Sequence, residues 1–187
     1  MKTNTIITIV VILVVLVGGF LLFSGGGGES ATEGVSDNTS KETSESFDKA
    51  PSFTLEDYDG NEVSSADFTG TMLVVNSWAV WCPFCVNELP DFGELQEAFS
   101  DDIVVIAIDR AEGLDRAKAF SDDLEVTDRI TFLLDPRDSF YRSIGGFSMP
   151  ETIFVDADGN IRLHKRGPMD FEEMKRIVNS ILNDEGV

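Results

Sequence analysis

The sequence predicts an α/β domain in which helices flank a central mixed β-sheet, and two observations support that fold class. Short apolar runs rich in β-branched residues alternate with longer segments whose apolar residues recur at helical spacing. Toward the end of the chain, two such runs flank a turn, and one last helical segment follows them. Alternating strands and helices build a parallel sheet, and the late hairpin adds antiparallel strands to it. We expect this domain to occupy residues 47–187.

Each strand is predicted from a short apolar or turn-flanked run. Residues 53–55 and 62–64 flank the turn Asp59-Gly60-Asn61 and indicate an N-terminal β-hairpin extension. The runs MLVVNSW at residues 72–78 and IVVIAID at residues 103–109 are apolar and β-branched, which is typical of buried central strands. The remaining expected strands are residues 131–134, 152–155 and 161–165, and the last two flank a turn with an Asp-Gly-Asn sequence.

The helices are predicted from apolar residues that recur every three or four positions. In the last of them, Asp170 can cap the first turn, and the helix runs to about Leu182 with its apolar face toward the core. The first begins at Pro83, a residue that suits the first turn because it lacks an N–H group. The expected helices are residues 83–99, 114–124, 139–144 and 171–182.

Composition excludes several classes of protein. The chain has 187 residues, and its 34 acidic and 14 basic side chains give a formal net charge of −20. Sequence-independent binding of nucleic acid needs clustered Lys and Arg, so we expect no nucleic-acid partner. The two cysteines are too few for a disulfide scaffold or for a zinc site built from cysteine alone.

An apolar segment near the N-terminus predicts a membrane anchor. The 18 residues from Ile6 to Phe23 carry no charge and would span roughly 27 Å as a helix, close to the thickness of a bilayer. Lys2 precedes the segment, so the N-terminus should be cytoplasmic and the domain extracytoplasmic, on a single-pass protein of the cell membrane. A cleaved signal peptide is the alternative, although its apolar core would be shorter and a small-residue cleavage site would follow.

Between anchor and domain, a flexible linker is expected. Residues 24–46 consist mainly of Gly, Ser, Thr and acidic residues, which cannot bury enough apolar surface to order the chain. The sequence thus divides into an anchor at residues 1–23, a linker at residues 24–46 and the folded domain.

The chemistry is expected at Cys82 and Cys85, in the segment Trp81-Cys82-Pro83-Phe84-Cys85. This segment lies where a predicted buried strand ends and a predicted helix begins. Free N–H groups and a partial positive charge at a helix N-terminus favour an anion, which lowers the pKa of a thiol there. Cys82 would therefore be the attacking thiolate, and Cys85, one turn into the helix, would resolve the mixed disulfide.

Two other interpretations of the cysteines remain. A structural disulfide across so short a loop would stabilise the domain by roughly 2 kcal/mol, which is little for a domain of this size. A metal site would need further ligands, and the only histidine, His164, lies on a late strand where we expect a surface position. We therefore predict a redox-active disulfide, Cys82–Cys85, with no metal and no other cofactor.

With these residues in view, the domain resembles the thioredoxin fold, and within it the TlpA/ResA-like group of membrane-anchored thiol-disulfide oxidoreductases. The position of a buried Asp in thioredoxin itself is Asn76 here, which favours that group. The segments that carry the resemblance are FTL at residues 53–55, VVNSWAVWCPFC at 74–85, ELP at 88–90 and MPETIFVD at 149–156.

The resemblance implies roles for several residues. Pro150 would be the cis-proline of a loop that faces the cysteines and pairs with the partner polypeptide, and Met149 before it would touch the disulfide. Glu88 matches an acid that assists proton transfer at the thiols. Trp81 would line the groove for the partner. Pro83 and Phe84, between the cysteines, would contact the substrate and tune the reduction potential.

The resemblance also implies partners. The protein would exchange electrons with protein thiols and disulfides, as a reductant by analogy, and could serve the haem-attachment cysteines of apocytochrome c. A membrane thiol reductant of the DsbD/CcdA kind would then recharge it. A peroxiredoxin-like peroxidase is an alternative, but its Pro-x-x-x-Thr-x-x element is missing before Cys82. A Sco-like copper-binding protein is a further alternative, which the two-residue spacing of the cysteines disfavours.

Overall fold

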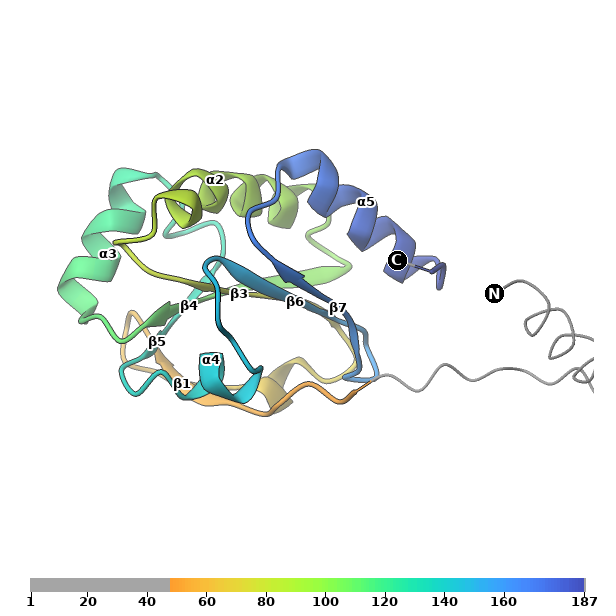
Figure 1. Ribbon diagram of the computed structural model, residues 1–187, viewed down its shortest axis with the longest axis horizontal. Helices are drawn as coiled ribbons and strands as arrows, with labels where there is room; N and C mark the ends of the chain where they lie inside the picture. Colours follow the sequence, from red (N-terminus) through yellow and green to blue (C-terminus); the bar gives the residue numbers. More distant parts are fainter. Residues whose placement is uncertain (1–47, 187) are drawn as a thin grey trace, which may run out of the picture. The chain divides into compact units, whose positions relative to one another are not determined.

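A seven-stranded mixed sheet forms the centre of the computed structural model, which describes residues 48–186 (Figure 1). Its strands lie in the order β2-β1-β5-β4-β3-β6-β7. Their bounds are Thr54–Asp57 for β1, Glu62–Ser64 for β2, Met72–Trp78 for β3, Ile103–Arg110 for β4, Thr131–Asp135 for β5, Glu151–Val155 for β6 and Ile161–Arg166 for β7.

The helices follow the strands much as the spacing of apolar residues predicts. Their bounds are Pro83–Ala98 for α2, Leu114–Asp123 for α3, Ser139–Ser143 for α4 and Phe171–Leu182 for α5. Asp170 caps α5, because its side chain accepts a hydrogen bond from the N–H of Glu173 at 2.8 Å. The bounds of strands and helices agree with the predicted ones to within one residue, apart from the end of β1, which lies two residues further along the chain.

One element is not predicted, the 3₁₀ turn η1 at Ser65–Phe68. Ser64 caps it, with its side chain accepting from the N–H of Ala66 at 3.3 Å while Asp67 accepts from the N–H of Ser64 at 2.8 Å. This reciprocal capping stabilises a single turn that is too short to show a helical period in the sequence.

The sheet combines parallel and antiparallel pairs, as predicted. Strand β4 runs parallel to β3, in register from Met72 opposite Ile103 to Trp78 opposite Asp109, and parallel to β5 on its other side. Strand β6 runs antiparallel to β3, and β7 antiparallel to β6. Strand β3 lies between β4 and β6, so the turn that follows β3 at Trp78 leaves the sheet between these two strands.

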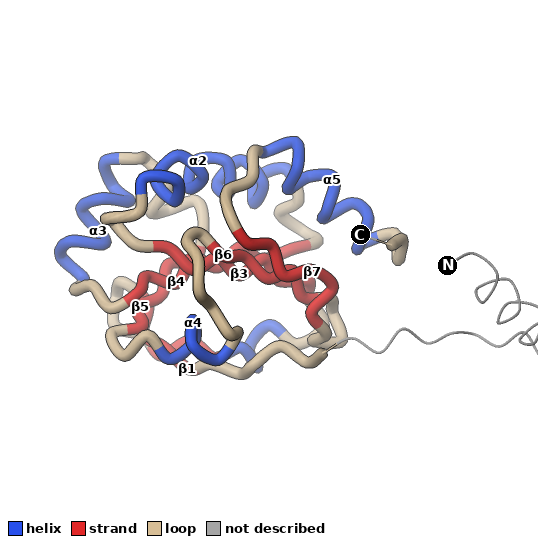
Figure 2. The backbone as a smooth tube through the Cα atoms, in the orientation of Figure 1, coloured by secondary structure: helices blue, strands red, loops and turns tan. Residues whose placement is uncertain are grey.

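Helices cover the two faces of the sheet unequally (Figure 2). On one face, α2, α3 and α5 pack over alternate residues of β3 and β4, and on the other lie α4 and η1. The face that α2, α3 and α5 cover forms the larger core, in which Phe92, Leu95 and Met174 are fully buried. Trp78 is also fully buried there, as expected. This core supports α2, the helix that carries the cysteines.

Two predictions concern residues outside those described, namely the anchor at residues 1–23 and the linker at residues 24–46. Within residues 48–186, no helix is both long enough and apolar enough to cross a membrane.

Candidate active site

Cys82 and Cys85 form a disulfide at the junction of β3 and α2, with their Cα atoms 5.3 Å apart. After β3 ends, the N–H of Cys82 donates to the carbonyl of Ala79 at 3.0 Å and closes a turn. Pro83 then opens α2 at its first position, as predicted. Because β3 ends shortly before Pro83 and α2 begins at Pro83, Cys82 lies at the N-terminus of the helix.

Cys82 occupies the N-cap of α2, which confirms its predicted position. Its sulfur accepts a hydrogen bond from the N–H of Cys85 at 3.2 Å. The same N–H group and the helix dipole would stabilise a thiolate at Cys82 once the disulfide is open.

The disulfide is shielded, whereas the aromatic residues beside it are open to solvent. Cys82 and Cys85 are 2% and 1% exposed, while Trp81 and Phe84 are 57% and 58% exposed. Exposed apolar side chains that form a contiguous patch mark a surface that meets a partner. A partner that contacts these rings would approach the sulfurs directly.

Glu88 lies one turn after Cys85 on α2, and it is buried, with 2% of its surface exposed. Its Oε1 accepts a hydrogen bond from the N–H of Met169 at 2.9 Å, while Oε2 has no partner among the described residues. Burial raises the pKa of Glu88 to about 8, because ionisation would place a charge in the core, and the Met169 N–H offsets only part of this effect. A carboxyl group that titrates near neutrality can both take and return a proton.

The loop before β6 contains the cis peptide bond Met149–Pro150 that the resemblance implies. Met149 packs against both apolar cores, one of which includes the two cysteines. Phe147 in the same loop is 76% exposed, and the Arg166 guanidinium stacks 4.8 Å from the centre of its ring. The loop therefore adds a further exposed aromatic residue to the surface of the domain.

Glu151, directly after Pro150, anchors this loop, a role that the sequence analysis does not assign. Its Oε1 accepts from the N–H groups of Phe147 and Ser148, both at 2.8 Å, and its Oε2 lies 2.7 Å from Nε2 of His164. Glu151 is fully buried. In the sequence, only the position of Glu151 within the MPETIFVD segment could have indicated this role.

The expectation that His164 is a surface residue is wrong. It lies on β7, as predicted, but only 17% of its side chain is exposed and it pairs with the buried Glu151. Cross-strand pairing explains the difference, because β7 lies against β6 and brings His164 opposite Ile153, next to the end of β6 where Glu151 lies.

Two neighbouring acidic residues, Asp109 and Glu112, lie next to the turn that carries Cys82. Asp109 ends the buried part of β4 and is fully buried, and Glu112 accepts a hydrogen bond from the N–H of Val80 at 2.6 Å. The sequence offered one signal for this pair, a carboxylate at the end of the otherwise apolar run IVVIAID.

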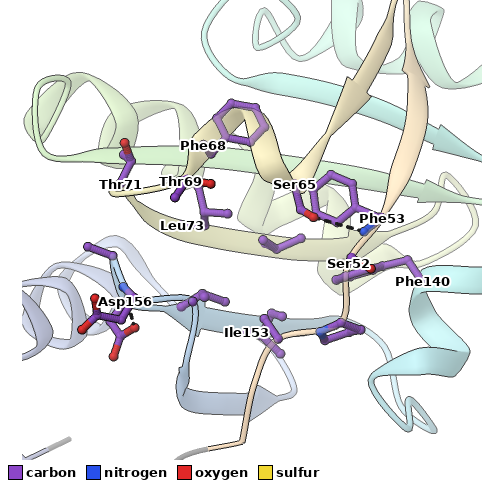
Figure 3. A pocket seen from close by; sticks show the side chains of 17 residues that line it. Ser52, Phe53, Ser65, Phe68, Thr69, Thr71, Leu73, Phe140, Ile153 and Asp156 are labelled. Atoms are coloured by element: carbon purple, nitrogen blue, oxygen red, sulfur yellow. Dashed lines mark hydrogen bonds between the residues drawn. The ribbon is translucent and has the colours of Figure 1, made fainter.

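One cavity lies away from the cysteines, on the face of the sheet that α4 and η1 cover (Figure 3). It has a volume of about 180 Å³, and Phe53, Phe68, Leu73, Phe140 and Ile153 are among the side chains that line it. None of the predicted site residues contributes to its lining. This cavity is thus separate from the disulfide site.

Metal ligands do not converge in the described part of the chain. Among residues 48–186, no group of three or more His, Cys, Asp or Glu side chains is arranged to hold a metal ion.

The fold and the site define a class of protein, the thioredoxin-like oxidoreductases that carry a dithiol at the start of a helix. A solved structure of a thioredoxin-family thiol:disulfide interchange protein from Chlorobium tepidum has a TM-score of 0.63 and 28% identity, and covers 74% of this chain and 98% of its own. In this chain, residues 45–182 match the family model described as redoxin.

Two curated relatives agree with this class. DsbE, a thiol:disulfide interchange protein of Allochromatium vinosum, is 33% identical over 139 residues, covering 69% of this chain and 73% of the relative. The thiol-disulfide oxidoreductase ResA of Geobacillus thermodenitrificans is 26% identical over 133 residues, covering 71% of this chain and 75% of the relative. The chain belongs to the redoxin family and is a thiol-disulfide oxidoreductase of the ResA/DsbE type.

Proposed function

We propose that this protein is a membrane-tethered reductant of disulfides in extracytoplasmic proteins, and that Cys82 and Cys85 carry its electrons. The observation that carries the proposal is the disulfide at the N-terminus of α2, with Cys82 as the N-cap. In that position one sulfur becomes a good nucleophile, and the other remains one turn away to complete the exchange.

The reaction begins from the dithiol form. The Cys82 thiolate attacks one sulfur of the substrate disulfide, so that a mixed disulfide forms and the other substrate sulfur leaves as a thiolate, which takes up a proton. Cys85 then loses its proton and attacks the Cys82 sulfur. The second substrate thiolate leaves and is protonated, and the protein ends as the Cys82–Cys85 disulfide. Two electrons pass from the protein to the substrate.

Glu88 is the group that we assign to the proton of Cys85. Cys85 is buried, so its proton needs an acceptor within the protein. Glu88 lies three residues further along the same helix, and its second carboxyl oxygen is unpartnered. Its pKa of about 8 lies close to that of a thiol, so a proton can move between the two groups at little cost.

The partner is a polypeptide in this proposal. Trp81 and Phe84 offer exposed rings beside the sulfurs, and Pro83 between them is exposed as well. The loop that holds Met149 and Pro150 would pair with an extended segment of the partner, as the resemblance implies. The haem-attachment cysteines of apocytochrome c are one such substrate.

The sequence supports the proposed location, and the resemblance supports the proposed means of recharging. The uncharged segment from Ile6 to Phe23, with Lys2 before it, supports a single membrane span with a cytoplasmic N-terminus. The domain would then work outside the cytoplasm, and a membrane thiol reductant of the DsbD/CcdA kind would return it to the dithiol form. A reporter fused to the C-terminus should be active outside the cytoplasm, and activity confined to the cytoplasm would contradict this orientation.

Single cysteine variants test the proposal. Cys82→Ser should abolish the reduction of insulin disulfides, while Cys85→Ser should trap a mixed disulfide through Cys82, because the resolving thiol is gone. The double variant Cys82→Ser/Cys85→Ser is the matched control and should trap nothing. Near-normal turnover by Cys82→Ser would contradict the assignment. No observation on the described residues favours the peroxidase or the copper-binding alternative.

A further inference from the structure

The turn that carries Cys82 is hydrogen-bonded to the side chain of Glu112, which follows β4. The N–H of Val80 donates to Oε2 of Glu112 at 2.6 Å, a short hydrogen bond to a carboxylate. Val80 lies two residues before Cys82, and the side chain of Glu112 is only 6% exposed. The position of Glu112 therefore influences the backbone that leads to the reactive sulfur.

Asp109 lies directly beside Glu112 and is fully buried. Its Oδ1 accepts a hydrogen bond from the N–H of Glu112 at 3.2 Å, while its Oδ2 has no partner among the described residues. The negative charge of one carboxylate disfavours ionisation of the other. Two buried carboxylates this close cannot both ionise without strong repulsion.

The donors around the pair indicate which carboxyl group is charged. Glu112 receives the Val80 N–H, and Nη1 of Arg116 lies 3.2 Å from its Oε1. Among residues 48–186, Asp109 has neither an N–H donor on its second oxygen nor a cation at ion-pair distance. We therefore assign the proton of the pair to Asp109.

Titratable groups surround this pair on some sides and not on others. On the neighbouring strands, Trp78 of β3 and Leu134 of β5 lie opposite Asp109 and do not titrate near neutral pH. Tyr58, in the turn after β1, interacts with both carboxyl groups, and burial raises its pKa above the ordinary value, so it stays neutral. The cleft on the other side of Glu112 also carries Glu56, Glu62, Asp135 and Arg137.

We propose that Asp109 and Glu112 are positioning residues that share one proton, and that loss of this proton loosens the turn at Val80 and makes a thiolate at Cys82 less favourable. In the singly protonated pair, Glu112 is fixed between Asp109 and the Val80 N–H. When the proton leaves, repulsion separates the carboxylates, and a second negative charge faces the active-site turn. Burial, together with the Glu112 carboxyl, raises the pKa of Asp109 well above its ordinary range, so this change belongs to alkaline pH.

Linkage makes the effect reciprocal. A thiolate formed at Cys82 disfavours ionisation of Asp109, so the dithiol form holds the shared proton to higher pH than the disulfide form. This redox step rests on the proposed function, whereas the titration of Val80 in the disulfide form does not. Asp109 and Glu112 would then influence the formation of the Cys82 thiolate, while Glu88 takes and returns the proton of Cys85.

The direct test is a titration of the oxidised, full-length chain in detergent micelles, from pH 4 to pH 10, by nuclear magnetic resonance. We expect the carboxyl carbon of Asp109 and the amide nitrogen of Val80 to titrate together above pH 7. In Asp109→Asn, a neutral isostere, Val80 should keep its acid-form shift throughout. Asp123→Asn, at an exposed position of α3, is the matched control and should behave like the wild type. Glu88→Gln should also leave Val80 unchanged.

The reduced protein supplies the second measurement, the alkylation rate of Cys82 against pH. The wild-type profile should show two steps, and Asp109→Asn should show one. An Asp109 carboxyl carbon that titrates near pH 4 in the wild type would overturn the proposal, and this result needs no variant to fold. A Val80 titration that persists in Asp109→Asn would overturn it as well. The Val80 amide shift could change with pH as expected while Cys82→Ser still reduces insulin. That result would contradict the proposed function and uphold the proposal that Asp109 and Glu112 share a proton.

Discussion

Replacement of Glu88 by glutamine should make the fold more stable at neutral pH while it impairs disulfide exchange. Glutamine keeps the size of the side chain and an oxygen that can accept from the Met169 N–H, but it cannot ionise. Glu88 is 2% exposed, so the wild-type fold holds the neutral carboxyl while the unfolded chain releases its proton to water.

The magnitude follows from the two pKa values. Burial moves the pKa of Glu88 from an ordinary 4.5 to about 8 in the fold, so the folded state binds more protons than the unfolded state between these values. Stability therefore falls as pH rises through this window, by about 1.4 kcal/mol per pH unit. Relative to glutamine, the wild type should lose about 3 kcal/mol by pH 7 and nothing at pH 4.

Urea unfolding of the two oxidised full-length chains at pH 4, 6, 7 and 8 measures this difference. Other titrating groups are common to both chains, so they cancel in the comparison. The same preparations, once reduced, are assayed for insulin-disulfide reduction, which should fall by roughly 10²-fold in the variant if Glu88 serves as acid and base. Glu94→Gln, at an exposed position of the same helix, is the matched control and should change neither quantity.

A stability difference that does not depend on pH would refute the reasoning, because it would mean that Glu88 has the same pKa in the folded and the unfolded chain. A pH-dependent difference with unchanged turnover would uphold the buried carboxyl and contradict its role in proton transfer. The pH profile of Cys85 alkylation should also shift in Glu88→Gln.

Three further substitutions test the packing, a helix cap and the partner surface. Phe92→Ala, at a fully buried position of α2, should lower the free energy of unfolding by about 3–5 kcal/mol in urea, whereas Leu182→Ala at the exposed end of α5 should change it by about 0.5 kcal/mol or less. Asp170→Ala should cost about 1 kcal/mol because it removes the cap on the Glu173 N–H, and Asp170→Asn should restore most of that stability; equal losses would contradict the capping role. Trp81→Ala should lower kcat/KM for a disulfide-bonded polypeptide by roughly tenfold or more, since exposed aromatic residues dominate such contacts. The rate with a small aromatic disulfide should stay within about twofold, and an equal loss for both substrates would indicate a damaged site instead of a lost contact.

The order of strands and helices could be predicted because apolar periodicity is a local property of the chain. The run MLVVNSW became β3 with the predicted bounds, and every residue of it is buried. The turn η1 was missed because one 3₁₀ turn contains too few residues to show a period. The final helix could be placed because Asp170 supplies a cap and its apolar residues share one face.

The site could be predicted only in part, for a related reason. Cys82 and Cys85 are neighbours in sequence, and their placement at the start of a helix follows from the strand before them and from Pro83. Glu151 and His164 meet because β6 pairs with β7, and no local pattern announces that contact.

That two cysteines three positions apart lie where a buried strand ends and a helix begins can be read from the sequence, because strand and helix periods and the N-terminal proline are all local signals. The electrostatics around the cysteines depend on the tertiary fold. Glu88 is buried beneath Met169, which lies 81 residues away, and Glu112 reaches Val80 across 32 residues. A pKa depends on desolvation and on charges nearby in space, and the folding of distant segments onto one another sets both.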